Sequence, residues 1–487
     1  MHTFKSLFRK KSNKKGLGLI HPLLSLIFAF VFCITAVLPV MADESEKPAD
    51  PALETAKSAL VFCVQADKTV WSKNADSPMY PAGAVKMMTA LIALEHYGDS
   101  MEGTYVTVTA AALRNVTGNR IGFKTGEMLT AKDLIAAVIV NGANDAASIL
   151  ATDIAGTPNK FAEMMNEKAL SLGMKDTNYT NPTGLHDSAM VTTASDLVIL
   201  AKYCYYNSTF MELCGVSRYS IPETNQHAER IISNRNYFIN VTSTNAYYYS
   251  IVNGMSVSYT AQAGYSIIAS AQYNGVDYIS IVLGGEEIVE VLSEEVVEID
   301  ETTGEKTVVT PAVTFNRIAG YTDAKKLFQY AIRNYSFRKV IDVSTIVCEI
   351  PVRLGTNIDH VTLLPEHSID LYLPNNEKTS DVVSYSWVLS SDSLTAPVEM
   401  GQKAGVLTVY YNGKELSKVD LVAKNNVERS EWLYILDSFR RITKTPLFRI
   451  TLLVIAALII IYFVKTAIEK KRRREQALRE FNKKYRS

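Results

Sequence analysis

The chain has 487 residues, of which 47% are hydrophobic, with 50 Lys and Arg balanced by 50 Asp and Glu. This length provides for two or three domains and at least one sizeable core. The composition therefore excludes a small peptide and a disordered tail.

The first 42 residues have the layout of a secretory signal peptide. Basic residues up to Lys15 precede an apolar run from Leu23 to Val40, and the small-residue end "VMA" comes before Asp43. This layout predicts a signal peptide over 1–42, with a retained N-terminal anchor as the alternative because the run is long. The polar residues 43–55, which include two prolines, read as a linker.

Residues 56–336 have the pattern of an α+β domain. Two short strands from Ser58 lead to a predicted amphipathic helix that begins near Gly83, and further helix-like blocks follow. After about residue 250 the period changes from 3.6 to 2, which predicts a three-stranded antiparallel meander with a hairpin turn at Asn274 and Gly275. Late strands beside the first ones would complete one sheet.

Different patterns follow the meander. Residues 286–312 are an acidic excursion with a hairpin-like "TTGEK" tip, and a helix is predicted over Asp323 to Asn334. Short strands with turn residues between them predict a small all-β domain over 337–425.

The C-terminal region has the features of a membrane anchor. An amphipathic segment over 426–446 precedes an uninterrupted apolar run from Ile450 to Val464, which predicts a transmembrane helix over 447–467. The strongly basic tail 468–487 is expected in the cytoplasm by the positive-inside bias. The localisation expected is therefore a single-pass cell-membrane protein with its main domains outside.

Charge is distributed unevenly along the chain. The leader has six basic residues, and the sequence after Val464 has ten basic and three acidic ones, which leaves 34 basic against 47 acidic between them. A net charge of about −13 outside the membrane excludes nucleic acid as a partner.

The cysteines suggest neither a metal nor a cofactor. Apart from Cys33, the chain has Cys63, Cys204, Cys214 and Cys348, widely spread and without metal-ligand spacing. Buried free thiols are the default, and a disulfide between Cys204 and Cys214 stays an alternative.

The segment "YPAGAVKMMTALIALEHYG", residues 80–98, places a small residue three positions before Lys86 at a helix start. It resembles the serine-x-x-lysine motif of the D-alanyl-D-alanine carboxypeptidase family of penicillin-binding proteins. Residues three apart share a helix face, so in that family the lysine can take the proton of the serine hydroxyl. In this sequence Gly83 stands at the nucleophile position.

The resemblance covers most of residues 55–425. It includes "KTGEMLTAKDLIAAVIVNGANDAA", "LGMKDTNYTNPTGLHD", "TTASDLVILAKY", "YTAQAGYSIIASAQYNG" and "APVEMGQKAGVLTVYYNGKEL". It implies a penicillin-binding/β-lactamase-like transpeptidase domain, an antiparallel sheet with helices, followed by the family's small C-terminal β domain.

The other two family motifs are also degenerate. The serine-x-asparagine motif falls at Gly142-Ala143-Asn144, where only the asparagine remains. The lysine-threonine-glycine motif, which would hold the substrate carboxylate, corresponds to Ser256-Val257-Ser258. The matching letters at Lys124-Thr125-Gly126 precede the second motif and are interpreted as a turn.

Two functions follow from the resemblance. The first is a membrane-anchored, catalytically inactive homologue that binds a peptidoglycan stem peptide or a cell-wall protein. The second is an active serine peptidase that trims stem peptides through another hydroxyl, for which Ser72, Ser256 and Ser258 are available. Lys86 and Asn144 would have a structural role in the first case, bonded to each other or to backbone carbonyls.

Overall fold

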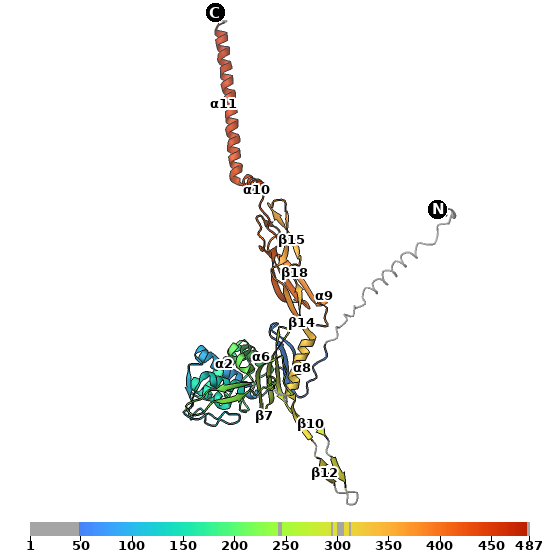
Figure 1. Ribbon diagram of the computed structural model, residues 1–487. Helices are drawn as coiled ribbons and strands as arrows, with labels where there is room; N and C mark the ends of the chain where they lie inside the picture. The colour runs from blue at the N-terminus through green and yellow to red at the C-terminus, as the bar shows by residue number, and fades with distance from the viewer. Residues whose placement is uncertain (1–47, 242–245, 294–295, 300–305, 311–312, 485–487) are drawn as a thin grey trace, which may run out of the picture. The chain divides into compact units, whose positions relative to one another are not determined.

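Figure 1 shows the computed structural model, which describes residues 48–241, 246–293, 296–299, 306–310 and 313–484. The predicted signal peptide and the 302–305 part of the "TTGEK" tip lie outside these residues.

The first domain is built on a five-stranded antiparallel sheet with the strand order β2-β1-β9-β8-β7. Its strands are β1 (Ser58–Cys63), β2 (Lys68–Lys73), β7 (Val252–Thr260), β8 (Gly264–Tyr273) and β9 (Val276–Gly285). The early and late strands therefore share one sheet, as the sequence predicts. Asn274 and Gly275 join β8 to β9 with φ angles of 49° and 78°, the positive values that a two-residue I′ turn requires.

Helices pack against one face of this sheet. The alternation along β1 directs Leu60 and Phe62 into the core beneath these helices. The elements between β2 and β7 are η1 (Ala82–Ala84), α2 (Val85–Tyr97), η2 (Gly98–Ser100), β3 (Tyr105–Thr107), β4 (Met128–Thr130), α3 (Ala131–Ala136), the π-helical η3 (Ala137–Asn141), α4 (Asn144–Ala155), α5 (Pro158–Leu172), α6 (Ala194–Tyr206), α7 (Ser208–Gly215), β5 (Arg218–Ile221) and β6 (Arg230–Ser233).

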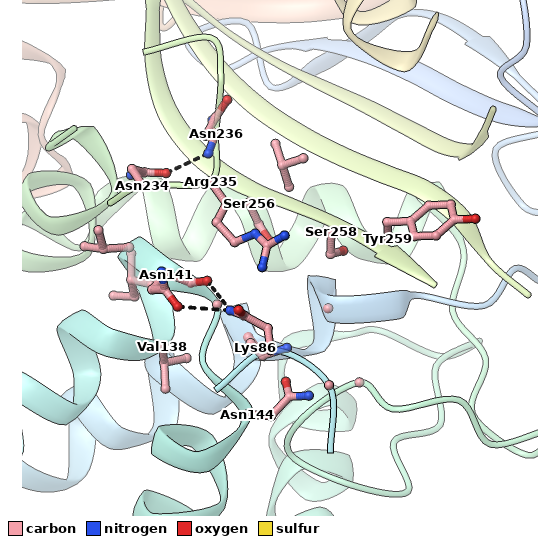
Figure 2. A pocket seen from close by; sticks show the side chains of 18 of the residues that line it. Lys86, Val138, Asn141, Asn144, Asn234, Arg235, Asn236, Ser256, Ser258 and Tyr259 are labelled. Carbon is pink, nitrogen blue, oxygen red and sulfur yellow. Dashed lines mark hydrogen bonds between the residues drawn. The ribbon is translucent and has the colours of Figure 1, made fainter. Parts of the chain in front are cut away.

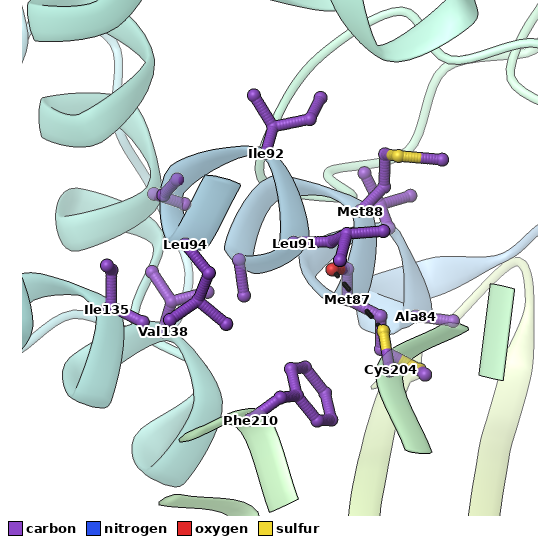
Figure 3. Packing of buried hydrophobic residues seen from close by; sticks show 14 of the residues in the cluster. Ala84, Met87, Met88, Leu91, Ile92, Leu94, Ile135, Val138, Cys204 and Phe210 are labelled. Atoms are coloured by element: carbon purple, nitrogen blue, oxygen red, sulfur yellow. Dashed lines mark hydrogen bonds between the residues drawn. The ribbon is translucent and has the colours of Figure 1, made fainter. Parts of the chain in front are cut away.

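Helix α2 is buried on nearly every side, which corrects the prediction of an amphipathic helix. Ten of its 13 residues are buried. Figure 3 shows Met87 and Leu94 packed among side chains from other segments, including Val138 and Phe210. A helix that is apolar around its whole circumference belongs inside a domain. The start of α2 is thereby held rigidly at the pocket described below.

Helix α8 (Ala319–Asn334) covers the opposite face of the sheet, where Val61 packs with Phe328. It begins four residues before the predicted start, because Ala319 and Tyr321 are also buried. Its Asp323 carboxylate accepts hydrogen bonds from the backbone N–H groups of residues 54–56, at 2.6–3.0 Å. The end of the predicted linker is therefore fixed to this helix.

The acidic segment forms antiparallel ribbons. Strand β10 (Glu287–Ser293) pairs with β13 (Val313–Ile318), and β11 (Val296–Ile299) pairs with β12 (Lys306–Thr310).

The second domain is an all-β unit with its own core, in which Ile350, Leu363 and Leu407 are fully buried. A six-stranded sheet has the order β18-β20-β21-β16-β15-β19, and β14 pairs with β17. The elements are β14 (Tyr335–Ile341), β15 (Cys348–Arg353), β16 (His360–Pro365), β17 (Ile369–Pro374), α9 (Thr379–Val382), β18 (Val383–Leu389), β19 (Leu394–Thr395), β20 (Lys403–Tyr411) and β21 (Lys414–Ala423).

Two helices follow, α10 (Glu431–Lys444) and α11 (Pro446–Lys484). Helix α11 is long and apolar enough to cross a membrane by length and composition, with a mean hydropathy of 2.7 over its most apolar window.

Candidate functional site

The three segments that the sequence analysis compares with family motifs meet at one pocket of about 500 Å³ in the first domain. Figure 2 shows side chains from separate segments around it, among them Lys86, Asn144, Arg235, Ser256 and Ser258. All seven candidate residues from the sequence analysis are among those that line this pocket: Gly83, Lys86, Gly142, Asn144, Ser256, Val257 and Ser258.

Gly83 is buried in η1, directly opposite Ser258 on the edge strand β7. A Cβ atom placed on Gly83 would lie 2.7 Å from the Cβ of Ser258 and 3.3 Å from its Oγ. The first distance is too short for two carbon atoms. The side chain of Ser258 therefore fills the space that a serine at position 83 would need.

The Ser258 hydroxyl is itself poorly placed to act as a nucleophile. Its Oγ is shielded from solvent and has no hydrogen-bond partner among the described residues. A nucleophile needs both access to the substrate and a base within hydrogen-bond reach. Ser258 therefore does not replace the missing serine in this conformation.

Lys86 extends along the wall of the pocket and donates a hydrogen bond to the backbone carbonyl of Thr183, at 2.5 Å. Burial, with a smaller contribution from the positive charge of Arg235, lowers the pKa of the Lys86 amine to about 7. The amine could serve as a base at neutral pH, but no hydroxyl at position 83 is present to give it a proton.

The second motif lies where η3 ends and α4 begins. Gly142 has φ 71° and ψ 33°, a left-handed conformation that a serine would adopt only with strain. Asn144 donates from Nδ2 to the carbonyl of Thr117 at 2.7 Å, while its Oδ1 has no partner among the described residues. Both Asn144 and Lys86 are thus bonded to backbone carbonyls.

The third motif lies on the edge strand β7. Ser256 lines the pocket with a short side chain, and Val257 packs against the core beneath α8. Neither residue supplies the cation that a lysine at position 256 would bring to the pocket. The strand therefore contributes no positive charge to ligand binding.

Arg235 is a pocket residue that the sequence analysis missed. It lies in the loop after β6 as an exposed residue between the buried Asn234 and Asn236, and Figure 2 shows its guanidinium group reaching toward the middle of the pocket. The described pocket-lining residues include Arg235 and Lys86 but no Asp or Glu. The only signal in the sequence is one arginine between Asn234 and Asn236, which no periodicity marks.

Other candidates lie elsewhere. Lys124-Thr125-Gly126 does not line the pocket and forms a turn before β4 in which Gly126 has φ 82°. Ser72 is on β2, at the opposite edge of the sheet from β7. Cys204 and Cys214 are both free and buried. Within the described ranges no three His, Cys, Asp or Glu residues gather to hold a metal ion.

An antiparallel sheet with helices on both faces, and a pocket between a buried helix start and an edge strand, define an α+β fold of the penicillin-binding-protein type. The chain belongs to the D-alanyl-D-alanine carboxypeptidase family, whose model matches residues 44–287. A second model, the C-terminal domain of penicillin-binding protein 5, matches residues 335–429.

The alignments with two curated relatives cover at least 90% of the length of each relative. The chain is 23% identical to the D-alanyl-D-alanine carboxypeptidase DacF of Bacillus subtilis, over 85% of this chain and 96% of the relative. It is 25% identical to DacC of Escherichia coli, over 82% of this chain and 90% of the relative.

Solved structures share the fold. Penicillin-binding protein 5 of Haemophilus influenzae has a TM-score of 0.53 and 24% identity, covering 78% of this chain and all of that one. A peptidoglycan synthesis regulatory factor of Streptococcus pneumoniae has a TM-score of 0.54 and 21% identity, covering 77% and 99%.

Proposed function

We propose that the protein is a membrane-anchored homologue of D-alanyl-D-alanine carboxypeptidases that binds peptidoglycan stem peptides outside the membrane without cleaving them. The main support for a loss of activity is that Ser258 fills the space of a side chain at position 83, since a Cβ on Gly83 would lie 2.7 Å from the Ser258 Cβ. Without a hydroxyl at position 83 no acyl-enzyme forms there, and removal of such a nucleophile from a serine protease costs on the order of a million-fold in rate.

The charge of the pocket supports a retained binding role. Arg235 is a positive group, the Lys86 amine with its pKa of about 7 is half protonated at neutral pH, and no acidic residue is among the described lining residues. An arginine fork can bind a carboxylate through two parallel hydrogen bonds. Arg235 would thus hold the terminal carboxylate of a stem peptide, a role that the degenerate strand motif no longer supports.

Membrane attachment is supported by α11 and by the segment before it. The apolar window of α11 is not covered by any described part of the chain. So large an apolar surface is unfavourable in water and is typical of a segment that lies in a membrane. Family resemblance and a basic C-terminal tail support placement of the two folded domains on the outer side.

The binding proposal is tested with a pentapeptide that ends in D-alanyl-D-alanine, titrated into the full chain by calorimetry. We expect saturable binding to the wild type and no D-alanine in the mixture by chromatography. Arg235→Gln should weaken binding about 10- to 100-fold, since charge-assisted hydrogen bonds contribute about 1.5–3 kcal/mol. Arg218→Gln, on an exposed position of β5, is the matched control and should bind as the wild type does.

Two results would contradict the proposal separately. Release of D-alanine would show an active enzyme. Absence of saturable binding, or equal binding by the wild type and Arg235→Gln, would remove the binding role that we assign to the pocket.

A further inference from the structure

A second pocket, of about 340 Å³, lies between the β domain and α10. Its polar lining comes from Arg353 at the end of β15, Thr395 at the end of β19, and Asp437, Arg440, Arg441 and Lys444 of α10. Arg440 and Arg441 are each three or four positions from both Asp437 and Lys444, so the four residues share one side of the helix. The pocket is therefore built by two separate elements.

This pocket carries an excess of positive charge. Four basic side chains face a single carboxylate, Asp437, which pairs with Arg353 at 3.7 Å and with Arg441. Arg440 and Lys444 have no carboxylate partner within the part of the chain that the structure describes. A cluster of this kind repels itself unless an anion is bound.

The pocket has a fixed place relative to the apolar parts of the chain. The backbone N–H of Ser430 donates to the carbonyl of Leu354 at 2.8 Å, which ties the start of α10 to the β domain. Trp432, Leu436 and Phe439 on α10 are exposed large apolar side chains. Lys444 is two residues before the first residue of α11.

We propose that this pocket binds the phosphate group of an anionic phospholipid in the outer leaflet. Guanidinium groups match phosphate oxygens in geometry and charge, and the Thr395 hydroxyl is a further donor. A lipid is favoured over free phosphate because the pocket ends two residues before the apolar helix α11, and α10 also exposes large apolar side chains that lipid tails can cover. The inference rests on the membrane attachment proposed above.

The test is native mass spectrometry of the full chain released from detergent micelles, with phosphatidylglycerol, phosphatidylcholine or excess inorganic phosphate. We expect one phosphatidylglycerol retained per chain, several-fold more often than phosphatidylcholine, and little displacement by inorganic phosphate. Arg353→Gln and the double variant Arg440→Gln/Lys444→Gln should each reduce retention about tenfold. Arg449→Gln, on α11 outside the pocket, is the matched control and should retain the lipid.

Each contrary result has a definite meaning. Equal loss in Arg449→Gln, or unchanged retention in Arg353→Gln, would show general attraction to basic helices and overturn the pocket. Complete displacement by inorganic phosphate would overturn the lipid assignment. Carbonate extraction of cell membranes distinguishes failure of the lipid pocket from failure of membrane attachment. Extraction measures attachment through α11 alone, whereas lipid retention in micelles measures binding at the pocket alone.

Discussion

Gly83 has no side chain, and the side chain of Ser258 on β7 occupies the space beside it. Under the motif alignment that we propose from the sequence, the family has a serine at position 83 and a glycine at position 258. Here the side chain is on position 258, 2.7 Å from the place of a Cβ on Gly83. The sequence shows two separate departures from the family motifs. Only the three-dimensional contact shows that the two departures are coupled, because a serine restored at position 83 alone would clash with Ser258.

A double-mutant cycle tests this coupling. Gly83→Ser should lower the free energy of unfolding by about 1–3 kcal/mol through overpacking, and adding Ser258→Gly should recover most of that loss. Neither variant should release D-alanine, because Gly142 and Ser256 still lack the family's side chains. Thermal and denaturant melts of the four proteins measure the coupling. Additive effects of the two substitutions would contradict the contact.

Lys86 should make stability depend on pH. Its folded pKa is about 7, against an ordinary value of 10.5. Between these values the unfolded chain binds the proton and the folded chain does not, so stability rises as pH increases through this window. From pH 7 to about pH 9 the wild type should gain roughly 2 kcal/mol relative to Lys86→Met. A difference between the two proteins that does not change over this range would show that Lys86 titrates normally.

At the scale of elements, the turn at Lys124-Thr125-Gly126 has a structural explanation. Glu127 is fully buried and accepts from the Lys124 N–H at 3.0 Å and from the Thr224 hydroxyl at 2.9 Å, and it pairs with Arg230 of β6. Burial alone would raise the pKa of Glu127, but these bonds lower it below the ordinary value. Glu127 therefore links the turn to Arg230 of β6.

Arg230→Gln should be strongly destabilising. It leaves the buried Glu127 carboxylate without its cation, a change that typically costs about 3–5 kcal/mol. Arg218→Gln on the paired strand β5 is exposed and should change stability by less than about 0.5 kcal/mol. Thermal melting compares the two variants. Similar midpoints for both would show that the buried pair contributes little.

Several elements were predictable because their local pattern determines them. Alternation predicts β7, β8 and β9, and Asn274-Gly275 predicts the turn between the last two. The burial of α2 on nearly every side was not predictable, because it depends on helices far along the chain. Arg235 was missed because a loop residue has no periodicity, and its direction into the pocket is a tertiary property.

At the scale of the whole molecule, the length of α11 is informative. Its 39 residues would extend about 58 Å at 1.5 Å per residue, roughly twice a bilayer core of about 30 Å. The apolar part comes first and the basic part second. We therefore expect the basic half to emerge into the cytoplasm.

Protease added to intact protoplasts should remove both folded domains and leave a C-terminal tag protected. The same tag should be cleaved after the membrane is permeabilised, which is the control for access. Cleavage of the tag from outside in intact protoplasts would reverse the topology.

We expect that no serine of this chain forms an acyl-enzyme. The most direct measurement is the intact mass of the full chain after prolonged incubation with penicillin, with an active member of the family treated in parallel. We expect an unchanged mass, because position 83 has no hydroxyl and the Ser258 Oγ is shielded from solvent. A stable increase by the mass of one penicillin, mapped by peptide sequencing to any serine, would contradict it.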